Sequence, residues 1–73
     1  MVVEDYPMIN QIITEFLKEN YHEVFSILDG KETLTFVYRK RLDLIILDIM
    51  LPSMTGLEVL QTIRKTSDLP IIC

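Results

Sequence analysis

The stretch LDLIILDIMLPSMTG, Leu42–Gly56, carries the clearest structural pattern of the chain. Within it, Leu44–Leu47 is an unbroken aliphatic run without polar alternation, which is typical of a central strand in a parallel sheet that is buried on both faces. Asp48 follows this run directly, and a second apolar block with Pro52 and Gly56 comes next. Because ligand sites of open parallel sheets lie at the carboxyl ends of strands, Asp48 is a candidate functional residue.

Strand and helix patterns alternate on both sides of this stretch. Besides Leu44–Leu47, the predicted strands are Met1–Val3, Glu23–Leu28 and Leu69–Ile72. An apolar spacing of i, i+3, i+4, i+7 and i+8 predicts a first amphipathic helix, Pro7–Asn20. The residues with this spacing are Ile9, Ile12, Ile13, Phe16 and Leu17.

Two further helices are expected. The turn at Asp29-Gly30 begins a second helix that ends near Arg41. Its predicted inward residues are Leu34, Val37 and Tyr38, whereas Phe36 lies off this stripe and has no assigned place. Thr55 and Glu58 have the spacing of a capping box at the start of a third helix. The predicted inward residues of that helix are Val59, Leu60 and Ile63.

Together these elements predict an α/β fold in which a parallel sheet carries helices on both faces. The 73 residues allow one small domain at most, and an apolar content of 49% excludes a disordered tail.

The net charge of −4 argues against nucleic-acid binding by this segment. A single cysteine, Cys73, rules out an internal disulfide. The absence of a signal peptide and of a membrane-spanning run predicts a cytoplasmic protein without membrane contact.

Carboxylates follow two of the predicted strands. Glu4 and Asp5 end the first strand as Asp48 ends the third, so the three meet at one edge if these strands are neighbours. Clustered carboxylates resist ionisation unless a cation is present, and a set of oxygen ligands suits Mg²⁺. A carboxylate can also accept a phosphoryl group. The pattern suggests a phosphoacceptor, Asp48, beside a metal site; the alternative is that these acids only cap strands or face solvent.

Three motifs carry a resemblance to a known family: VVEDY (2–6), LDLIILDIMLPSMTGLEVLQTIRK (42–65) and LPIIC (69–73). They resemble the receiver domain of bacterial two-component response regulators, over essentially the whole chain. The style is closest to receivers that are attached to winged-helix transcription factors. The resemblance implies a flavodoxin-like (CheY-like) sheet with the strand order 2-1-3-4-5.

The resemblance also implies roles for individual residues. Asp48 matches the phosphoacceptor, which takes its phosphoryl group from a sensor histidine kinase and also contacts Mg²⁺. Asp5 matches a direct Mg²⁺ ligand, Glu4 an acid that acts through a water, and Met50 a residue whose backbone carbonyl binds the metal. Such a domain is a phosphoacceptor and not an enzyme, and the complete protein is expected to regulate transcription.

The chain departs from the family pattern at its end. The family's Thr or Ser after the fourth strand would lie beyond Cys73, and no Lys or Arg matches the lysine that follows the fifth strand. We therefore expect residues 1–73 to be a partial receiver domain, truncated after the start of the fourth strand, with impaired phosphoryl chemistry and no output domain. The alternative is a non-catalytic fragment that serves only as an interaction or self-association module, and we expect the isolated chain to self-associate.

Overall fold

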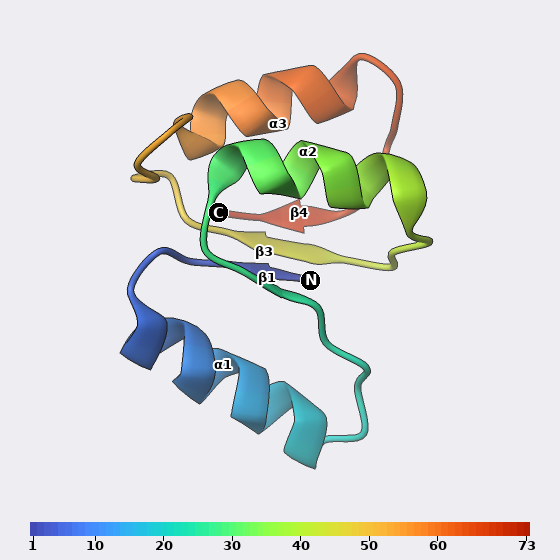
Figure 1. The fold of residues 1–73 in the computed structure, drawn as a ribbon. Helices are drawn as coiled ribbons and strands as arrows, with labels where there is room; N and C mark the ends of the chain where they lie inside the picture. Colours follow the sequence, from blue (N-terminus) through green and yellow to red (C-terminus); the bar gives the residue numbers. More distant parts are fainter.

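A computed structural model describes all 73 residues, Met1–Cys73. The elements in chain order are β1 (Val2–Val3), α1 (Pro7–Glu19), β2 (Ser26–Ile27), α2 (Gly30–Arg39), β3 (Ile45–Leu47), α3 (Gly56–Arg64) and β4 (Ile71–Ile72). Figure 1 shows α1 on one face of the sheet and α2 and α3 on the other. The predicted α/β fold with helices on both faces is confirmed. None of these helices is long and apolar enough to cross a membrane.

All four strands are parallel, in the order β2-β1-β3-β4. In this register Val3 lies between Ile27 and Leu47, so β1 and β3 end at the same level. The Asp48 N–H donates to the Val3 carbonyl over 2.9 Å and continues this pairing beyond the strand. The next residues of both strands therefore leave the sheet side by side.

The hydrophobic core lies between the sheet and the α2–α3 layer. Its buried members are Val3, Ile27, Ile45, Leu47, Leu51, Val59 and Ile63. The predicted inward positions of α3 are confirmed, since Val59 and Ile63 are fully buried and Leu60 packs against the core. Thr55 is the N-cap of α3, as predicted, and its hydroxyl accepts the Glu58 N–H over 3.2 Å.

The predicted inward face of α2 is only partly correct. Leu34 and Val37 pack against the core, but Tyr38 is 61% exposed. Successive helix residues are turned by about 100°, and the buried direction runs through Thr33, so Tyr38 points outward. Phe36, which had no assigned place, packs against Phe25 with ring centroids 5.8 Å apart.

The amphipathic helix predicted for α1 is present, but three of the five residues of its apolar stripe are exposed. Ile13 and Leu17 are half-buried, whereas Ile9, Ile12 and Phe16 are exposed, the last two at 61% and 64%. The side of α1 that meets β1 and β2 instead carries Asn10 and Thr14, which are both buried. The polar face is tolerated there because Asn10 bonds to the backbone of both neighbouring segments.

Several element boundaries are tighter than predicted. β2 keeps only Ser26–Ile27 of the predicted Glu23–Leu28, and β4 keeps only Ile71–Ile72 of Leu69–Ile72. Pro70 has no N–H to donate to a ladder, which accounts for the late start of β4. The helices α1 and α2 each end within two residues of the predicted position, as expected for frayed helix ends.

Candidate phosphoacceptor and metal site

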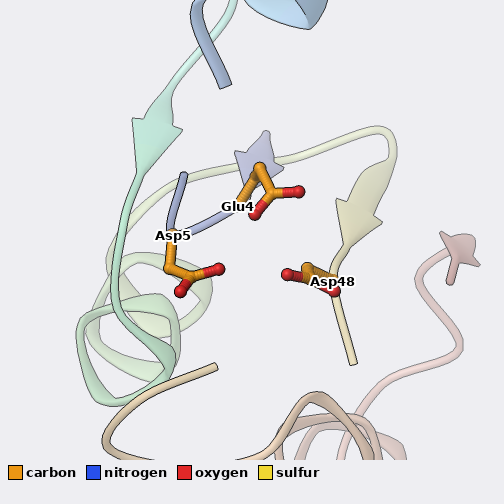
Figure 2. A group of neighbouring side chains, drawn as sticks. All are labelled: Glu4, Asp5 and Asp48. Carbon is orange, nitrogen blue, oxygen red and sulfur yellow. The ribbon is translucent and has the colours of Figure 1, made fainter. Parts of the chain in front are cut away.

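Three carboxylates converge where β1 and β3 end. Glu4 and Asp5 follow β1, and Asp48 follows β3. One carboxylate oxygen from each of the three lies within 4.8 Å of the others, and all three residues are half-buried. Figure 2 shows the three side chains facing a common space from the two strand ends. The structure thus brings together the acids that the sequence pattern placed at one edge.

The electrostatics of this cluster disfavour three full negative charges. Partial burial raises the pKa of the Glu4 carboxyl above its ordinary value, and the neighbouring Asp5 and Asp48 raise this pKa further. The Tyr6 N–H opposes the shift by donating to a Glu4 oxygen over 3.1 Å. A proton or a cation at this site would relieve the repulsion.

Backbone groups hold Asp48 in place. Its N–H is bonded to the Val3 carbonyl, and its Oδ1 accepts the Met50 N–H over 3.2 Å. The loop that follows is closed by the Gly56 N–H, which donates to the Ile49 carbonyl over 2.7 Å. Met50 is therefore next to the acidic cluster and bonded to it through its N–H, while the role of its carbonyl stays a prediction.

Gly56 allows this close approach because it has no side chain. A Cβ at this position would lie 2.2 Å from the Asp48 carbonyl oxygen and 2.7 Å from the Ile49 Cα. Both are backbone atoms, so they cannot rotate away from the added methyl group. The identity of residue 56 therefore fixes the path of the chain around Asp48.

The residues present fit a magnesium ion. Mg²⁺ takes hard oxygen ligands at about 2 Å, so ligand atoms around one ion are at most about 4 Å apart. The observed spread of up to 4.8 Å slightly exceeds this limit for three direct ligands. It suits a site in which one acid acts through a water, and Mg²⁺ commonly keeps several of its waters.

Some supporting residues were missed by sequence reasoning. Asn10 is buried, and its Nδ2 donates to the carbonyl oxygens of Glu4 and Ile27 over 3.1 and 3.0 Å. Asn10, which belongs to α1, therefore holds the backbone of Glu4 in place. The one signal for it was a polar residue inside the apolar pattern of a predicted helix. The bond between Asp29 and Ser53 was also missed, because the sequence predicted Asp29 only as a turn residue and, correctly, as the N-cap of α2.

Comparison with known proteins agrees with this geometry. The family model of the response regulator receiver domain matches residues 1–73. The chain belongs to this family, and it is a receiver domain of the two-component response-regulator type.

Individual relatives share both sequence and fold with the chain. The uncharacterized transcriptional regulatory protein YrkP of Bacillus subtilis (strain 168) is 44% identical over 72 residues, which make up 99% of this chain and 31% of that protein. The receiver domain of the Francisella response regulator 1452 superposes with a TM-score of 0.92 at 31% identity, covering 96% of this chain and 59% of that one.

Another similar structure was solved with ligands. The response regulator TrrA from Thermotoga maritima, in complex with Mg(2+)-BeF, has a TM-score of 0.86 at 39% identity, with coverage of 90% of this chain and 57% of that chain. The chain thus spans less than two thirds of the length of each of these relatives.

Proposed function

We propose that Asp48 accepts a phosphoryl group from the phosphohistidine of a sensor histidine kinase, in a reaction that requires Mg²⁺. The observation that carries this proposal is the meeting of Glu4, Asp5 and Asp48 at one sheet edge, within 4.8 Å of one another. Membership of the receiver family supports it, and so does the Mg(2+)-BeF complex of the similar response regulator TrrA.

In the proposed reaction a carboxylate oxygen of Asp48 attacks the phosphorus atom. The new O–P bond forms as the N–P bond to the histidine breaks, and the imidazole leaves with the electron pair. Because Oδ1 of Asp48 is held by the Met50 N–H, the carboxylate keeps a fixed orientation toward the incoming group. Bound Mg²⁺ would offset the charge of the phosphoryl oxygens. Asp5, Asp48 and the Met50 carbonyl would hold the ion directly, and Glu4 through a water.

A wider role is proposed on the basis of the family. We propose that this receiver acts in the cytoplasm, in a protein that regulates transcription, and that its partner is a cognate histidine kinase. The similarity to YrkP, which is named a transcriptional regulatory protein, supports the proposed role in transcription. The net charge of −4 supports signalling without direct nucleic-acid contact by this segment.

The experiment that tests the proposal maps the site of phosphorylation. The protein is treated with acetyl phosphate and Mg²⁺, and the acyl phosphate is located by peptide mass spectrometry. We expect a label of low stoichiometry on Asp48, in keeping with the impaired phosphoryl chemistry predicted for residues 1–73, and no label after Asp48→Asn or with the metal chelated. Asp43→Asn, at the other end of β3, is the matched control and should keep the label. A label that persists in the Asp48→Asn variant would contradict the proposal.

A second candidate function is favoured by the exposed side of α1. We propose that the chain can also act as a self-association module through this surface. Ile9, Ile12 and Phe16 are exposed there, and Ile72 on β4, at the edge of the sheet, is 56% exposed. Exposed apolar clusters of this kind commonly mark association surfaces.

A further inference from the structure

Two loops at the edge of the sheet where the three carboxylates meet are joined by a side-chain hydrogen bond. The first joins β2 to α2 and contains Asp29; the second joins β3 to α3 and contains Ser53. The Ser53 hydroxyl donates to Asp29 Oδ1, and the same carboxylate caps α2 by accepting the Lys31 N–H over 2.9 Å. One side chain therefore serves both a helix end and the loop that follows the phosphoacceptor.

The backbones of the two loops also meet. A Cβ on Gly30 would lie 2.6 Å from the Met54 carbonyl oxygen and 3.3 Å from a methyl group of Val59. Gly30 is buried, and Met54 packs against the core. The residues that follow Asp29 and Ser53 in the chain are therefore in close contact, beside the hydrogen bond between the two side chains.

The Ser53 bond differs from the other hydrogen bonds of its loop. Apart from the Asp48 N–H, which continues the pairing with β1, the remaining bonds are local: Met50 to Asp48, Gly56 to Ile49, and Glu58 to Thr55. The bond from Ser53 is the one that reaches across to a different loop. Because it lies between Met50 and Gly56, it limits the movement of the segment that carries the predicted metal-binding carbonyl.

We propose that Asp29 and Ser53 form a latch that holds the loop after Asp48 in the shape needed to bind a divalent cation and accept a phosphoryl group. The inference rests on the proposed function, and both residues are positioning residues that do not touch the reacting atoms. A free loop would lose backbone entropy when its carbonyl binds metal, and the latch removes much of that loss before the ion arrives.

A purely structural role would give a different result. If Asp29 serves only to cap α2, then removal of the Ser53 hydroxyl leaves the cap bond to Lys31 in place and leaves the acidic cluster unchanged. If the latch acts on the loop, the same substitution weakens metal binding while the protein stays folded. Affinity for a metal ion is therefore the readout that separates the two roles.

The experiment measures Mn²⁺ affinity by electron paramagnetic resonance, together with thermal unfolding. We expect Ser53→Ala to bind Mn²⁺ about two- to tenfold more weakly, the effect of losing one hydrogen bond, and Ser53→Thr to restore the affinity. Thr62→Ala is the matched control, because it removes an exposed hydroxyl that donates to the Glu58 carbonyl over 2.9 Å within α3. It should leave the affinity unchanged.

The reference variant Asp5→Asn separates the two proposals. If Asp5→Asn and the wild type bind Mn²⁺ equally, the metal site itself is wrong and the proposed function fails. If Asp5→Asn loses affinity while folded Ser53→Ala keeps the wild-type value, the latch alone is overturned. A loss of affinity in Thr62→Ala equal to that in Ser53→Ala would also overturn the latch, since the effect would then be one of general stability.

Discussion

At the scale of single residues, Asp48 is fixed by the backbone on three sides. Its N–H bonds to Val3, its carboxylate to Met50, and its carbonyl oxygen lies against Gly56. These contacts hold the side chain beside Glu4 and Asp5 at the cost of gathering like charges. The site should therefore be sensitive both to added volume and to changes in charge.

Added volume is tested at Gly56. We expect Gly56→Ala to lower the free energy of unfolding by about 2 kcal/mol, because the methyl group meets backbone atoms that must shift. Urea unfolding measures the change. The control Gln61→Ala lies on the exposed side of the same helix and should change stability by less than about 0.5 kcal/mol. Equal stability of Gly56→Ala and wild type would contradict the packing described.

Charge is tested at Glu4. Its pKa in the folded state is raised above the ordinary 4.5, so the folded protein favours the protonated acid. This contribution to stability is fully present below pH 4.5 and is lost as the pH rises through the folded-state pKa. In metal-free buffer we therefore expect Glu4→Gln to melt a few degrees above wild type at pH 7.

Melting of the same two proteins at low pH is the internal check on the role of the Glu4 charge. The difference in melting temperature between Glu4→Gln and wild type should close at pH 3, where the acid is protonated in both the folded and unfolded states. Glu15→Gln, an exposed acid on α1 outside the cluster, should not show this pH-dependent gain. A Glu4→Gln variant that melts below wild type at pH 7 would refute the explanation by partial burial and charge repulsion.

At the scale of elements, α1 is attached to the sheet by polar contacts more than by its apolar stripe. Asn10 uses both ends of its amide: Nδ2 donates to Glu4 and Ile27, and Oδ1 accepts the hydroxyls of Thr14 and Ser26. Buried polar groups that are fully bonded fix one arrangement of the elements that they join. Asn10 thereby links α1 to the ends of β1 and β2.

Replacement of this amide should loosen α1. We expect Asn10→Ala to lower the free energy of unfolding by about 2 kcal/mol, since the buried Ile27 carbonyl and Thr14 hydroxyl each lose a hydrogen-bond partner. Amide hydrogen exchange should show faster exchange in α1 than in α3. Gln11→Ala is the matched control, because Gln11 bonds only to the exposed Glu15 on the same helix. Similar, small effects of both substitutions would show that Asn10 does not anchor α1.

Much of the architecture was predictable from sequence, and the reasons are local. The aliphatic run before Asp48, the cap at Thr55 and the turn at Asp29-Gly30 each reflect chemistry within a few residues. The meeting of the carboxylates was predictable because parallel strands end at one edge. The side of α1 that packs against the sheet was not predictable, since an apolar stripe marks one face of a helix without showing which element covers it. The bond between Asp29 and Ser53 joins residues 24 positions apart and depends on the shapes of two loops.

At the scale of the whole molecule, one face of the sheet is only partly covered. α1 packs against β1 and β2, while Ile46 and Ile72 on the same face belong to β3 and β4 and are partly or largely exposed. Ile9, Ile12 and Phe16 lie along the exposed side of α1. An apolar surface of this kind drives association in water.

We expect the isolated chain to form dimers or larger assemblies at micromolar concentration through this surface. Sedimentation equilibrium measures the mass, and the double variant Ile12→Lys/Phe16→Lys should shift the protein toward monomer, because charges cannot be buried in an apolar contact. The matched control Gln11→Lys/Glu15→Lys changes exposed polar residues of the same helix and should leave the assembly intact. A monodisperse wild-type monomer would contradict this expectation.

Paramagnetic broadening of amide signals in nuclear magnetic resonance spectra maps bound Mn²⁺ and so tests the acidic cluster directly. If Glu4, Asp5 and Asp48 form one cation site, signals of residues 4–6 and 48–50 should broaden first, and those of 41–43 at the opposite end of the sheet should stay sharp. The selective pattern should vanish in Asp5→Asn. Broadening spread evenly over the exposed acidic residues, or the same pattern in Asp5→Asn as in wild type, would contradict a single cation site at these three carboxylates.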